Sequence, residues 1–362
     1  MYHRSISREI KRAVGWTALL ATSVLVEPSP IFAAVLEEVV VTAQKREQSL
    51  QDVPIAITAV SGNVLAERQI TSIDELGSIA PNMDFGTFSG QARVAVRGVG
   101  FDAINAGAEG RVAYHIDGVY VSRPAAQLAT FLDIERVEVL RGPQGTLYGR
   151  NATGGSINVI SNKPTDELAG YARLTYGNYD RVLAEGAVGG PIADGVKVRL
   201  AGQYDKRDGY GDSEFTGTEL DNQDSYGGRL TVGWEPSDRL SISLSGDYHK
   251  EDDHNYAIHY FGQYPDDLPL FSEAFLGGTA STDKRDLNTD TTPVNEREIY
   301  GYAADVQYEF DEVSLRSISG YRYSDYNTAS DYDFTEVLGT TISFAEDSDQ
   351  YSQEFQLSGA FE

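Results

Sequence analysis

Two stretches of the sequence carry residue types that could do chemistry. The first, GRNATGGS at residues 149–156, follows the phosphate-binding pattern G-x-x-x-x-G-K-[ST], except that Gly155 stands at the lysine position. Because that lysine is the fixed charge the motif brings to phosphates, the stretch is a weak nucleotide site. Residues 141–161 contain five glycines, which indicates closely packed turns because glycine has no Cβ atom.

The second stretch has histidines at five-residue intervals among carboxylates. Imidazole and carboxylate groups both bind metals, but this interval is not a known ligand spacing. The preferred interpretation is a solvated acidic loop, with no metal and no cofactor. No nucleophile–base pair stands out either, so the sequence does not indicate an enzyme. The metal candidates set aside are His249, His254 and His259, with Glu251, Asp252 and Asp253 between them.

Composition narrows the class of protein further. The 362 residues include no cysteine, which excludes disulfides and thiolate metal sites. The formal net charge of −26 is the wrong sign for a nucleic-acid-binding surface, so no nucleic-acid partner is expected. The chain has 22 tyrosines, whereas a disordered acidic chain would have few aromatic residues. We therefore expect a folded protein.

Residues 1–34 have the layout of a secretory signal peptide. Four basic residues precede an apolar run at residues 13–26, and small residues follow near Ala33 and Ala34. The run is too short to cross a membrane as a helix. No other segment is long and apolar enough to do so, and the mature protein is expected to leave the cytoplasm.

Residues 35–165 mix short strand patterns with one helical pattern. Apolar residues at helical spacing predict a helix over 63–81, which Pro81 ends. Strand patterns that run into glycine turns occur at 92–100, 113–121 and 134–143, and another strand is predicted at 53–62. Together these elements predict a small α+β domain.

After Pro164 the pattern changes to alternating apolar and polar residues. In residues 195–204, for example, Val196, Val198 and Leu200 share one face and polar residues the other. Such runs are long enough to cross a bilayer as tilted strands, and their short turns alternate with longer loops. Both features favour an antiparallel transmembrane β-barrel over the alternative, a soluble β-sandwich. The strands are predicted at 168–177, 180–189, 195–206, 222–234, 239–250, 297–310, 313–326 and 347–361, and the seventh alternates poorly because Ile318 falls on its polar face.

Five motifs resemble the TonB-dependent outer-membrane receptors. EEVVVTAQK (37–45) resembles the TonB box, and YSQEFQLSG (351–359) is similar to a barrel strand of the family. The three motifs similar to the family's plug domain are PNMDFGTFSGQARVAVRGVG (81–100), YHIDGVYV (114–121) and IERVEVLRGPQGTLYGRNATGGSINVISNKP (134–164). In that family, the glycine-rich run would fold turns of the plug.

The resemblance implies four regions. They are a signal peptide (1–34), a TonB-box segment (35–46), a plug domain (47–165) and the N-terminal part of a transmembrane β-barrel (166–362). A barrel of about 22 strands encloses a plug in such transporters, whereas a barrel of about eight is filled by its own side chains. With about eight predicted strands, the chain is expected to be a truncated receptor.

The resemblance also implies a function. We expect energised uptake of a scarce ligand, most often a ferric siderophore, across the outer membrane of a Gram-negative bacterium. Cobalamin, a carbohydrate and an aromatic compound are the alternative cargoes, and two roles without energised uptake stay open, a non-functional truncated receptor and a passive porin. The expected partners are outer-membrane lipid, the extracellular ligand and the periplasmic energy-transducing protein TonB, which would pair edge to edge with a strand-forming box. The box residues are Glu38, Val39, Val40, Val41, Thr42 and Ala43.

Arginines are the candidates for holding the plug inside the barrel. Arg97, Arg141 and Arg150 could pair with an inward-facing carboxylate of the barrel such as Glu354. Solvated charge pairs are individually weak, so they would hold the plug without fixing it permanently. The alternative is that these arginines bind nearby backbone carbonyls of their own domain.

Overall fold

The computed structural model describes residues 40–46, 48–100, 107–255, 257–259, 270 and 272–359. The signal-peptide prediction and the box residues Glu38 and Val39 lie outside these ranges. None of the helices in the described part is long and apolar enough to cross a membrane.

The N-terminal domain (residues 40–165) is built on a mixed five-stranded sheet with the order β3–β9–β10–β7–β8. Strand β10 pairs with β7 in parallel and with β9 antiparallel. Smaller antiparallel sheets are formed by β4–β5–β6 and by β1–β2. The strands are β1 Val40–Val41, β2 Gln48–Ser49, β3 Ile57–Ser61, β4 Met83–Phe88, β5 Gln91–Val96, β6 Val99–Gly100, β7 Val112–Ile116, β8 Val119–Tyr120, β9 Ile134–Arg141 and β10 Gly155–Ser161.

The single helix expected over 63–81 is two shorter pieces. Helix α1 spans Gly62–Glu67, and a 3₁₀ helix, η1, spans Ile73–Ser78. The chain turns at Gln69, whose φ of 55° is left-handed, and Ile70 N–H donates to Leu65 O at 2.8 Å. This six-to-one bond is a common way to end a helix, and it has no clear signal in the apolar spacing. The other short helices are η2 Ala125–Leu128 and α2 Gly145–Tyr148.

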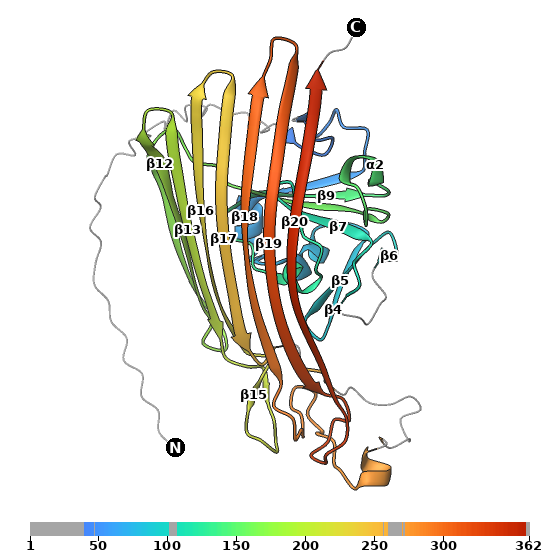
Figure 1. The fold of residues 1–362 in the computed structure, drawn as a ribbon. Helices are drawn as coiled ribbons and strands as arrows, with labels where there is room; N and C mark the ends of the chain where they lie inside the picture. Colours follow the sequence, from blue (N-terminus) through green and yellow to red (C-terminus); the bar gives the residue numbers. More distant parts are fainter. Residues whose placement is uncertain are drawn as a thin grey trace, which may run out of the picture. The chain divides into compact units, whose positions relative to one another are not determined.

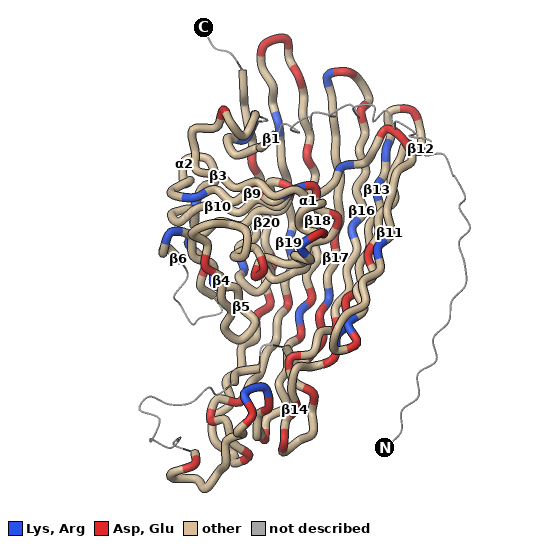
Figure 2. Tube along the Cα trace, turned by 180° about the vertical axis from the view of Figure 1, so that it is seen from behind, with Lys and Arg blue, Asp and Glu red and all other residues tan. Residues whose placement is uncertain are grey.

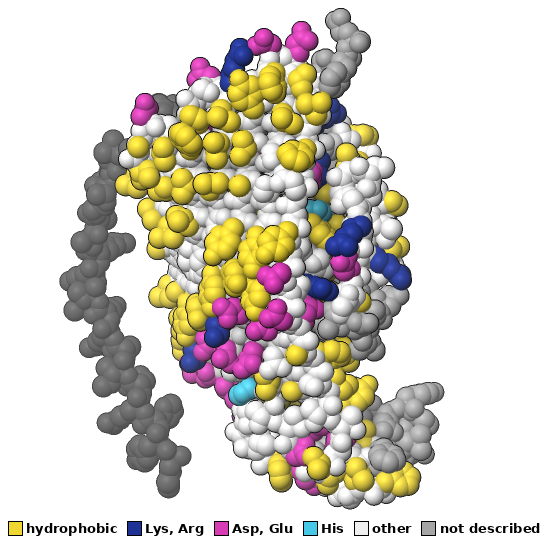
Figure 3. All heavy atoms as spheres, in the orientation of Figure 1, with side chains coloured by type: hydrophobic (Ala, Val, Ile, Leu, Met, Phe, Trp, Pro, Cys, Tyr) yellow, Lys and Arg dark blue, Asp and Glu magenta, His cyan; other side chains and the backbone are white. Residues whose placement is uncertain are grey.

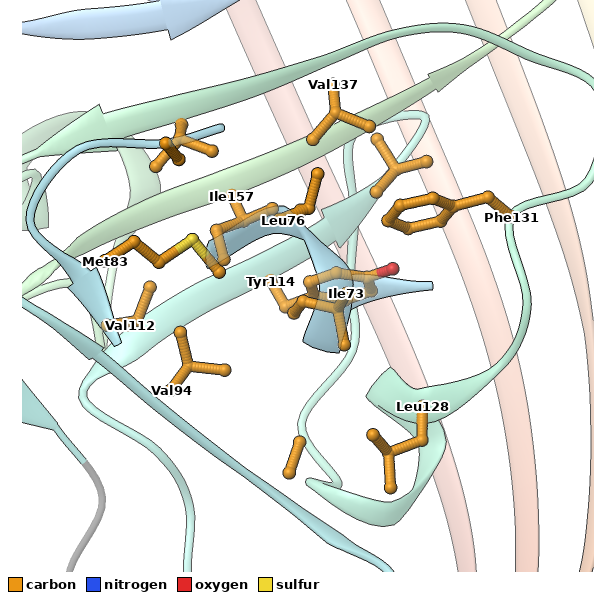
Figure 4. Packing of buried hydrophobic residues seen from close by; sticks show 14 of the residues in the cluster. Ile73, Leu76, Met83, Val94, Val112, Tyr114, Leu128, Phe131, Val137 and Ile157 are labelled. Atoms are coloured by element: carbon orange, nitrogen blue, oxygen red, sulfur yellow. The ribbon is translucent and has the colours of Figure 1, made fainter. Parts of the chain in front are cut away.

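The core of the domain lies where η1 and η2 pack on the sheets (Figure 4). Ile73 and Leu76 are fully buried, as is Ile157 of β10. Burying each such side chain contributes roughly 1.5–3 kcal/mol. The labelled members of the cluster in Figure 4 are Ile73, Leu76, Met83, Val94, Val112, Tyr114, Leu128, Phe131, Val137 and Ile157.

The second half of the chain forms an eight-stranded antiparallel sheet, which we call the wall. Its strands pair in chain order, β11–β12–β13–β16–β17–β18–β19–β20, so the predicted sequence of eight strands is confirmed. A short hairpin, β14 Gly211–Asp212 with β15 Glu219–Leu220, and a π-helix, η3 Ser272–Leu276, lie between wall strands. The wall strands are β11 Ala169–Tyr176, β12 Val182–Ala193, β13 Val196–Arg207, β16 Gln223–Ser237, β17 Leu240–Asp253, β18 Val294–Glu309, β19 Val313–Asp331 and β20 Thr341–Gly359.

The two faces of the wall differ in character. On β13, Arg199 and Gln203 are buried against the interior, whereas Leu200 and Tyr204 are exposed. Figure 3 shows the outward face, on which apolar side chains gather in bands over the strands. An apolar outer face next to a polar inner face is the pattern of a membrane β-barrel. Large exposed apolar residues of the wall include Val188, Leu200, Leu230, Leu244, Tyr302, Tyr351, Phe355 and Leu357.

The N-terminal domain lies against the inner face of the wall, as the front and back views agree (Figures 1 and 2). The three short turns β12–β13, β16–β17 and β18–β19 share one end of the wall, and the longer loops share the other. Ile318, which disturbed the alternation of its strand, is 3% exposed and reaches Gly118 of the N-terminal domain. An apolar residue on the polar face is therefore explained by packing against a second domain.

Candidate functional site: the N-terminal segment and the domain–wall contacts

The N-terminal segment, residues 40–43, is folded into the N-terminal domain. Val40 and Val41 form β1 and pair with Ser49 and Gln48 of β2. Val41 and Ala43 are fully buried, while Val40 is 41% exposed. Val41 and Ala43 pack in an apolar cluster with Val53, Ala113, Leu140, Tyr148 and Ala152.

Two buried side chains hold the backbone of this segment. The carboxylate of Glu138, on β9, accepts hydrogen bonds from Thr42 N–H at 2.8 Å and from the Thr42 hydroxyl at 3.2 Å. It also accepts from Arg136 Nε at 2.8 Å, so its charge is paired. The Tyr148 hydroxyl donates to Ala43 O at 3.1 Å. We call these contacts of Glu138 and Tyr148 the latch.

Tyr148 connects the latch to a buried histidine. Asn158 Nδ2 donates to the Tyr148 hydroxyl at 2.9 Å, and the ring of His115 lies 5.3 Å from the Tyr148 ring. Burial raises the pKa of Tyr148, and the nearby charge of Glu138 raises it further. Burial lowers the pKa of His115 to about 3, with a smaller contribution from the charge of Lys45. Both groups are therefore neutral in the folded domain near pH 7.

The pKa of His115 predicts a pH dependence of stability. Between pH 6.5 and about 3 the unfolded chain binds a proton at this histidine and the folded domain does not. The stability of the domain should therefore fall with decreasing pH in that window, by about 1.4 kcal/mol per pH unit. The domain is unfolded in urea at pH 7.5 and at pH 5, and hydrogen exchange monitors the unfolding. The difference between the two free energies of unfolding measures the pH dependence. His115→Gln should be less pH-dependent than the native protein, and equal pH dependence would contradict the prediction.

The glycine-rich run has a structural role in this fold. Gly142 and Gly149 have left-handed φ angles of 102° and 75°. A Cβ atom on Gly154 would lie 2.7 Å from Val99 O, and one on Gly155 would lie 2.2 Å from Leu140 O. Backbone therefore packs directly on backbone at these glycines. This is the turn-forming role expected for them, and it requires no phosphate.

Three arginines were predicted to hold the plug inside the barrel. Their contacts lie within the N-terminal domain. Arg150 pairs with Glu109 at 3.0 Å, and Arg141 Nη1 donates to Pro81 O at 3.5 Å. Arg97 lies in the β5–β6 turn with a left-handed φ of 53°, and its guanidinium lies beside Gly142. A pair between any of them and Glu354 is not among the contacts of the described residues.

Glu354 does contact the N-terminal domain, but through a lysine. Its carboxylate lies 3.1 Å from Nζ of Lys45, which also sits 4.7 Å from the centre of the Tyr148 ring. The side chains of Lys45 and Glu354 are 16% and 38% exposed. This pair connects the chain next to the N-terminal segment with β20 of the wall.

Three domain–wall contacts have the opposite arrangement to the prediction, because the wall strands supply the arginines. Arg199 of β13 forms a two-point pair with Asp133, at 2.5 and 2.7 Å, and both side chains are buried. Arg229 of β16 donates to Leu132 O at 2.9 Å. Arg297 of β18 donates to Gly90 O at 2.9 Å. None of these three arginines was predicted from the sequence.

The ring nitrogens of the three candidate histidines lie beside different groups. His249 Nδ1 lies 3.5 Å from the Thr130 hydroxyl, and His254 Nδ1 lies 3.1 Å from Glu219 O. His259 Nε2 pairs with Asp221. In the described ranges, no group of three or more His, Asp or Glu side chains is placed to hold a metal ion.

An α+β domain packed on the polar inner face of a wall with an apolar outer face defines the class of plugged outer-membrane β-barrels. Within that class, residues 49–156 match the TonB-dependent Receptor Plug Domain. The matched segment is therefore a plug domain of the TonB-dependent receptors, and the relatives and structures below are receptors that the chain resembles over a larger part of its length. The predicted resemblance and fold class are confirmed.

The chain is similar to curated receptors and to solved receptor structures. It is 32% identical over 203 residues to the pesticin receptor of Yersinia pestis, covering 54% of this chain and 28% of that protein. It is 28% identical over 197 residues to an iron-regulated outer membrane virulence protein of Vibrio cholerae, covering 49% and 30%. The structure of the ferric yersiniabactin uptake receptor of Yersinia pestis matches with a TM-score of 0.72 at 20% identity, covering 85% of this chain and 46% of that one.

A second solved structure, the ferripyoverdine receptor of Pseudomonas aeruginosa, matches with a TM-score of 0.71 at 16% identity. It covers 90% of this chain and 42% of the receptor. At these identities the structural matches show the fold. The chain spans less than half the length of each of these four proteins.

Proposed function

We propose that the chain is part of a TonB-dependent importer in the outer membrane, which takes up a ferric siderophore. The observation that carries the proposal is the packing of the N-terminal domain on the inner face of the wall, with the strand-forming N-terminal segment at the end of the short turns. A filled lumen does not conduct passively, so uptake needs a rearrangement. A strand-forming segment that is partly exposed at Val40 offers a partner the means to cause it.

The cargo is proposed from the relatives. The names of two of the four proteins above include ferric yersiniabactin and ferripyoverdine, and a third is described as iron-regulated. Cobalamin, a carbohydrate or an aromatic compound stay as alternatives, and competition against labelled ferric siderophore would separate them. The carboxylates near the long-loop end of the wall (Figure 2) do not attract an anionic siderophore, so its capture would depend on local contacts.

A proline at residue 40 tests the role of the N-terminal segment. Val40 is partly exposed and lies on a two-residue strand, so Val40→Pro removes an N–H donor and restricts pairing with little effect on the core. We expect the loss of energised uptake of radiolabelled ferric siderophore, with binding to whole cells unchanged. Val40→Thr keeps the donor and the β-branched shape and should transport normally. Uptake by Val40→Pro at the native rate would refute the docking role.

A further inference from the structure

Three polar side chains lie together on the outer face of β19 and β20. Ser317 and Ser319 of β19 point outward, because Ile318 between them is buried against the N-terminal domain. Gln353 of β20 is exposed on the same face. The Ser319 hydroxyl donates to Gln353 Oε1 at 2.6 Å, and Gln353 Nε2 donates to the Ser317 hydroxyl at 3.0 Å. We call these three side chains the polar row.

Apolar and aromatic side chains lie on both sides of the polar row along the strands. Figure 3 shows this part of the outer face as a pale band between two groups of apolar side chains. The polar row therefore lies within the apolar band of the wall, where polar side chains are costly against lipid and indicate a function. The flanking outward residues are Leu315, Phe355 and Leu357 towards the short turns and Tyr302, Tyr321 and Tyr351 towards the long loops.

A row of carboxylates lies beyond the tyrosines, towards the long loops. Glu298 of β18 is directly opposite Asp325 of β19, and Asp325 is directly opposite Asp347 of β20. We call these three residues the acidic row. Like charges in directly opposite positions destabilise a sheet. Lys250 of β17 is opposite Glu298 and supplies one positive charge for three negative ones.

The contacts of the acidic row leave its charge in place. The Tyr323 hydroxyl donates to Asp347 at 3.0 Å, which orients this carboxylate without neutralising it. Among the ion pairs of the described residues, none includes Glu298, Asp325 or Asp347. An exposed arrangement that costs stability and has no compensating contact within the chain indicates a compensating contact from outside it.

The two rows together argue against lipid and against a second copy of the chain as the molecule that covers this face. Acyl chains offer no hydrogen-bond partner to the polar row, and lipid phosphates are negative, so the acidic row would repel them. In a two-fold dimer the same patch meets itself. The two acidic rows would then face each other at the same depth in the membrane.

We propose that the outer face of β18–β20 is the docking surface for a different protein of the outer membrane. That protein presents hydrogen-bonding side chains to the polar row and lysine or arginine side chains to the acidic row. The Ser317 hydroxyl accepts from Gln353 and, within the described part of the chain, donates to no other group, so it has a donor to offer. This inference goes beyond the proposed uptake and does not depend on the cargo.

Photo-crosslinking in the native host tests the proposal. The photoreactive amino acid p-benzoylphenylalanine replaces Ser319 in the receptor as its host makes it. In the matched control it replaces Leu244, an outward residue of β17 that is 50% exposed. We expect one adduct with a different protein at position 319 and none at position 244. In the Asp325→Lys variant the yield of this adduct should fall at least about tenfold, because like charges then meet across the interface. Reversing the charge of the apposed lysine or arginine should restore the yield.

Other results of the crosslinking would overturn the proposal. An adduct that contains two copies of this chain alone would mean self-association. An adduct with lipid that is lost when EDTA removes divalent cations would mean that lipid phosphates cover the acidic row through a bridging cation. The same conclusion against the proposal follows if position 319 gives no protein adduct, or if Asp325→Lys leaves the yield unchanged.

Asp325→Asn tests the acidic row in the absence of any other protein. The purified receptor is refolded in phosphatidylcholine vesicles and unfolded in urea. Removing the central charge should raise the urea concentration at the midpoint of unfolding, because it relieves two like-charge contacts. The matched control Asp311→Asn removes an exposed carboxylate that is paired with Arg239, and it should not raise the midpoint. An unchanged or lower midpoint for Asp325→Asn would show that the acidic row is neutralised within the chain, which would remove the need for a cationic partner.

Discussion

Replacing Asp133 with asparagine is expected to lower the free energy of opening of the N-terminal domain by about 3–5 kcal/mol, because the substitution leaves the buried guanidinium of Arg199 without a counter-charge. Asparagine keeps the shape of the side chain and tolerates the left-handed backbone at this position. The change in the opening free energy therefore measures the contribution of the negative charge of Asp133. Native-state hydrogen exchange of the β9 amides, measured as a function of urea concentration, gives the opening free energy.

Two further variants show whether the pair or the single charge matters. Arg199→Met alone should also be destabilising, whereas the double variant Asp133→Asn/Arg199→Met should recover much of the loss, because no unpaired charge is left inside. The matched control is Arg239→Met, which removes an exposed pair with Asp311 and should cost within about 1 kcal/mol. Additive effects in the double variant would contradict the assigned pairing.

Replacing Glu138 with alanine is expected to open the latch. Hydrogen bonds to a charged group contribute about 1.5–3 kcal/mol, so exposure of the N-terminal segment should increase roughly 10- to 150-fold. The readout is the rate at which a maleimide labels Ala43→Cys, a position that is fully buried in the folded domain. Glu138→Gln should lie between the native protein and Glu138→Ala, since the amide oxygen still accepts from Thr42 N–H.

Glu135→Gln is the matched control for the latch. Glu135 also pairs with Arg136, but its side chain is 42% exposed, and the hydrogen bonds of Thr42 to a carboxylate go to Glu138 instead. This variant should leave the labelling rate unchanged. If the N-terminal segment is the docking site, Glu138→Ala should also bind the periplasmic partner without added ligand. Unchanged labelling in Glu138→Ala would show that the apolar contacts of Val41 and Ala43 hold the segment by themselves.

The wall could be predicted closely because its signal is local. A strand buried on one face and exposed on the other alternates residue by residue, and the strand predicted at 195–206 is found at Val196–Arg207. The predictions for the last four strands were too short towards the long loops. The strand predicted at 313–326 continues to Asp331, and the strand predicted at 347–361 begins at Thr341. Beyond the bilayer the outer face has no need of apolar residues, so the alternation fades although the pairing continues.

The domain–wall contacts could be predicted only in part. Arg199 stands on the polar face of a strand whose alternation is clear, so its inward direction was visible. The acceptor of its hydrogen bonds could not be predicted, since Asp133 lies 66 residues earlier in the chain. Arg229 donates to the Leu132 carbonyl and to the Ser161 hydroxyl, and Arg297 donates to the Gly90 carbonyl. A backbone carbonyl has no side-chain signal in the sequence. In other sequences, an isolated arginine at an inward-facing position of such a strand is the pattern that would predict a contact of this kind.

The strand order of the two sheets bears on how the molecule is assembled. Each wall strand pairs with its neighbours in the chain, so the wall can grow hairpin by hairpin from local contacts. The sheet of the N-terminal domain pairs β3 at residues 57–61 with β9 at residues 134–141, and it includes a parallel pair. Non-local pairings of this kind form slowly, because a long loop must close first. The surface that receives residues 40–43 is built from β9 and α2, so the N-terminal segment is secured only after the slow closure of this sheet is complete.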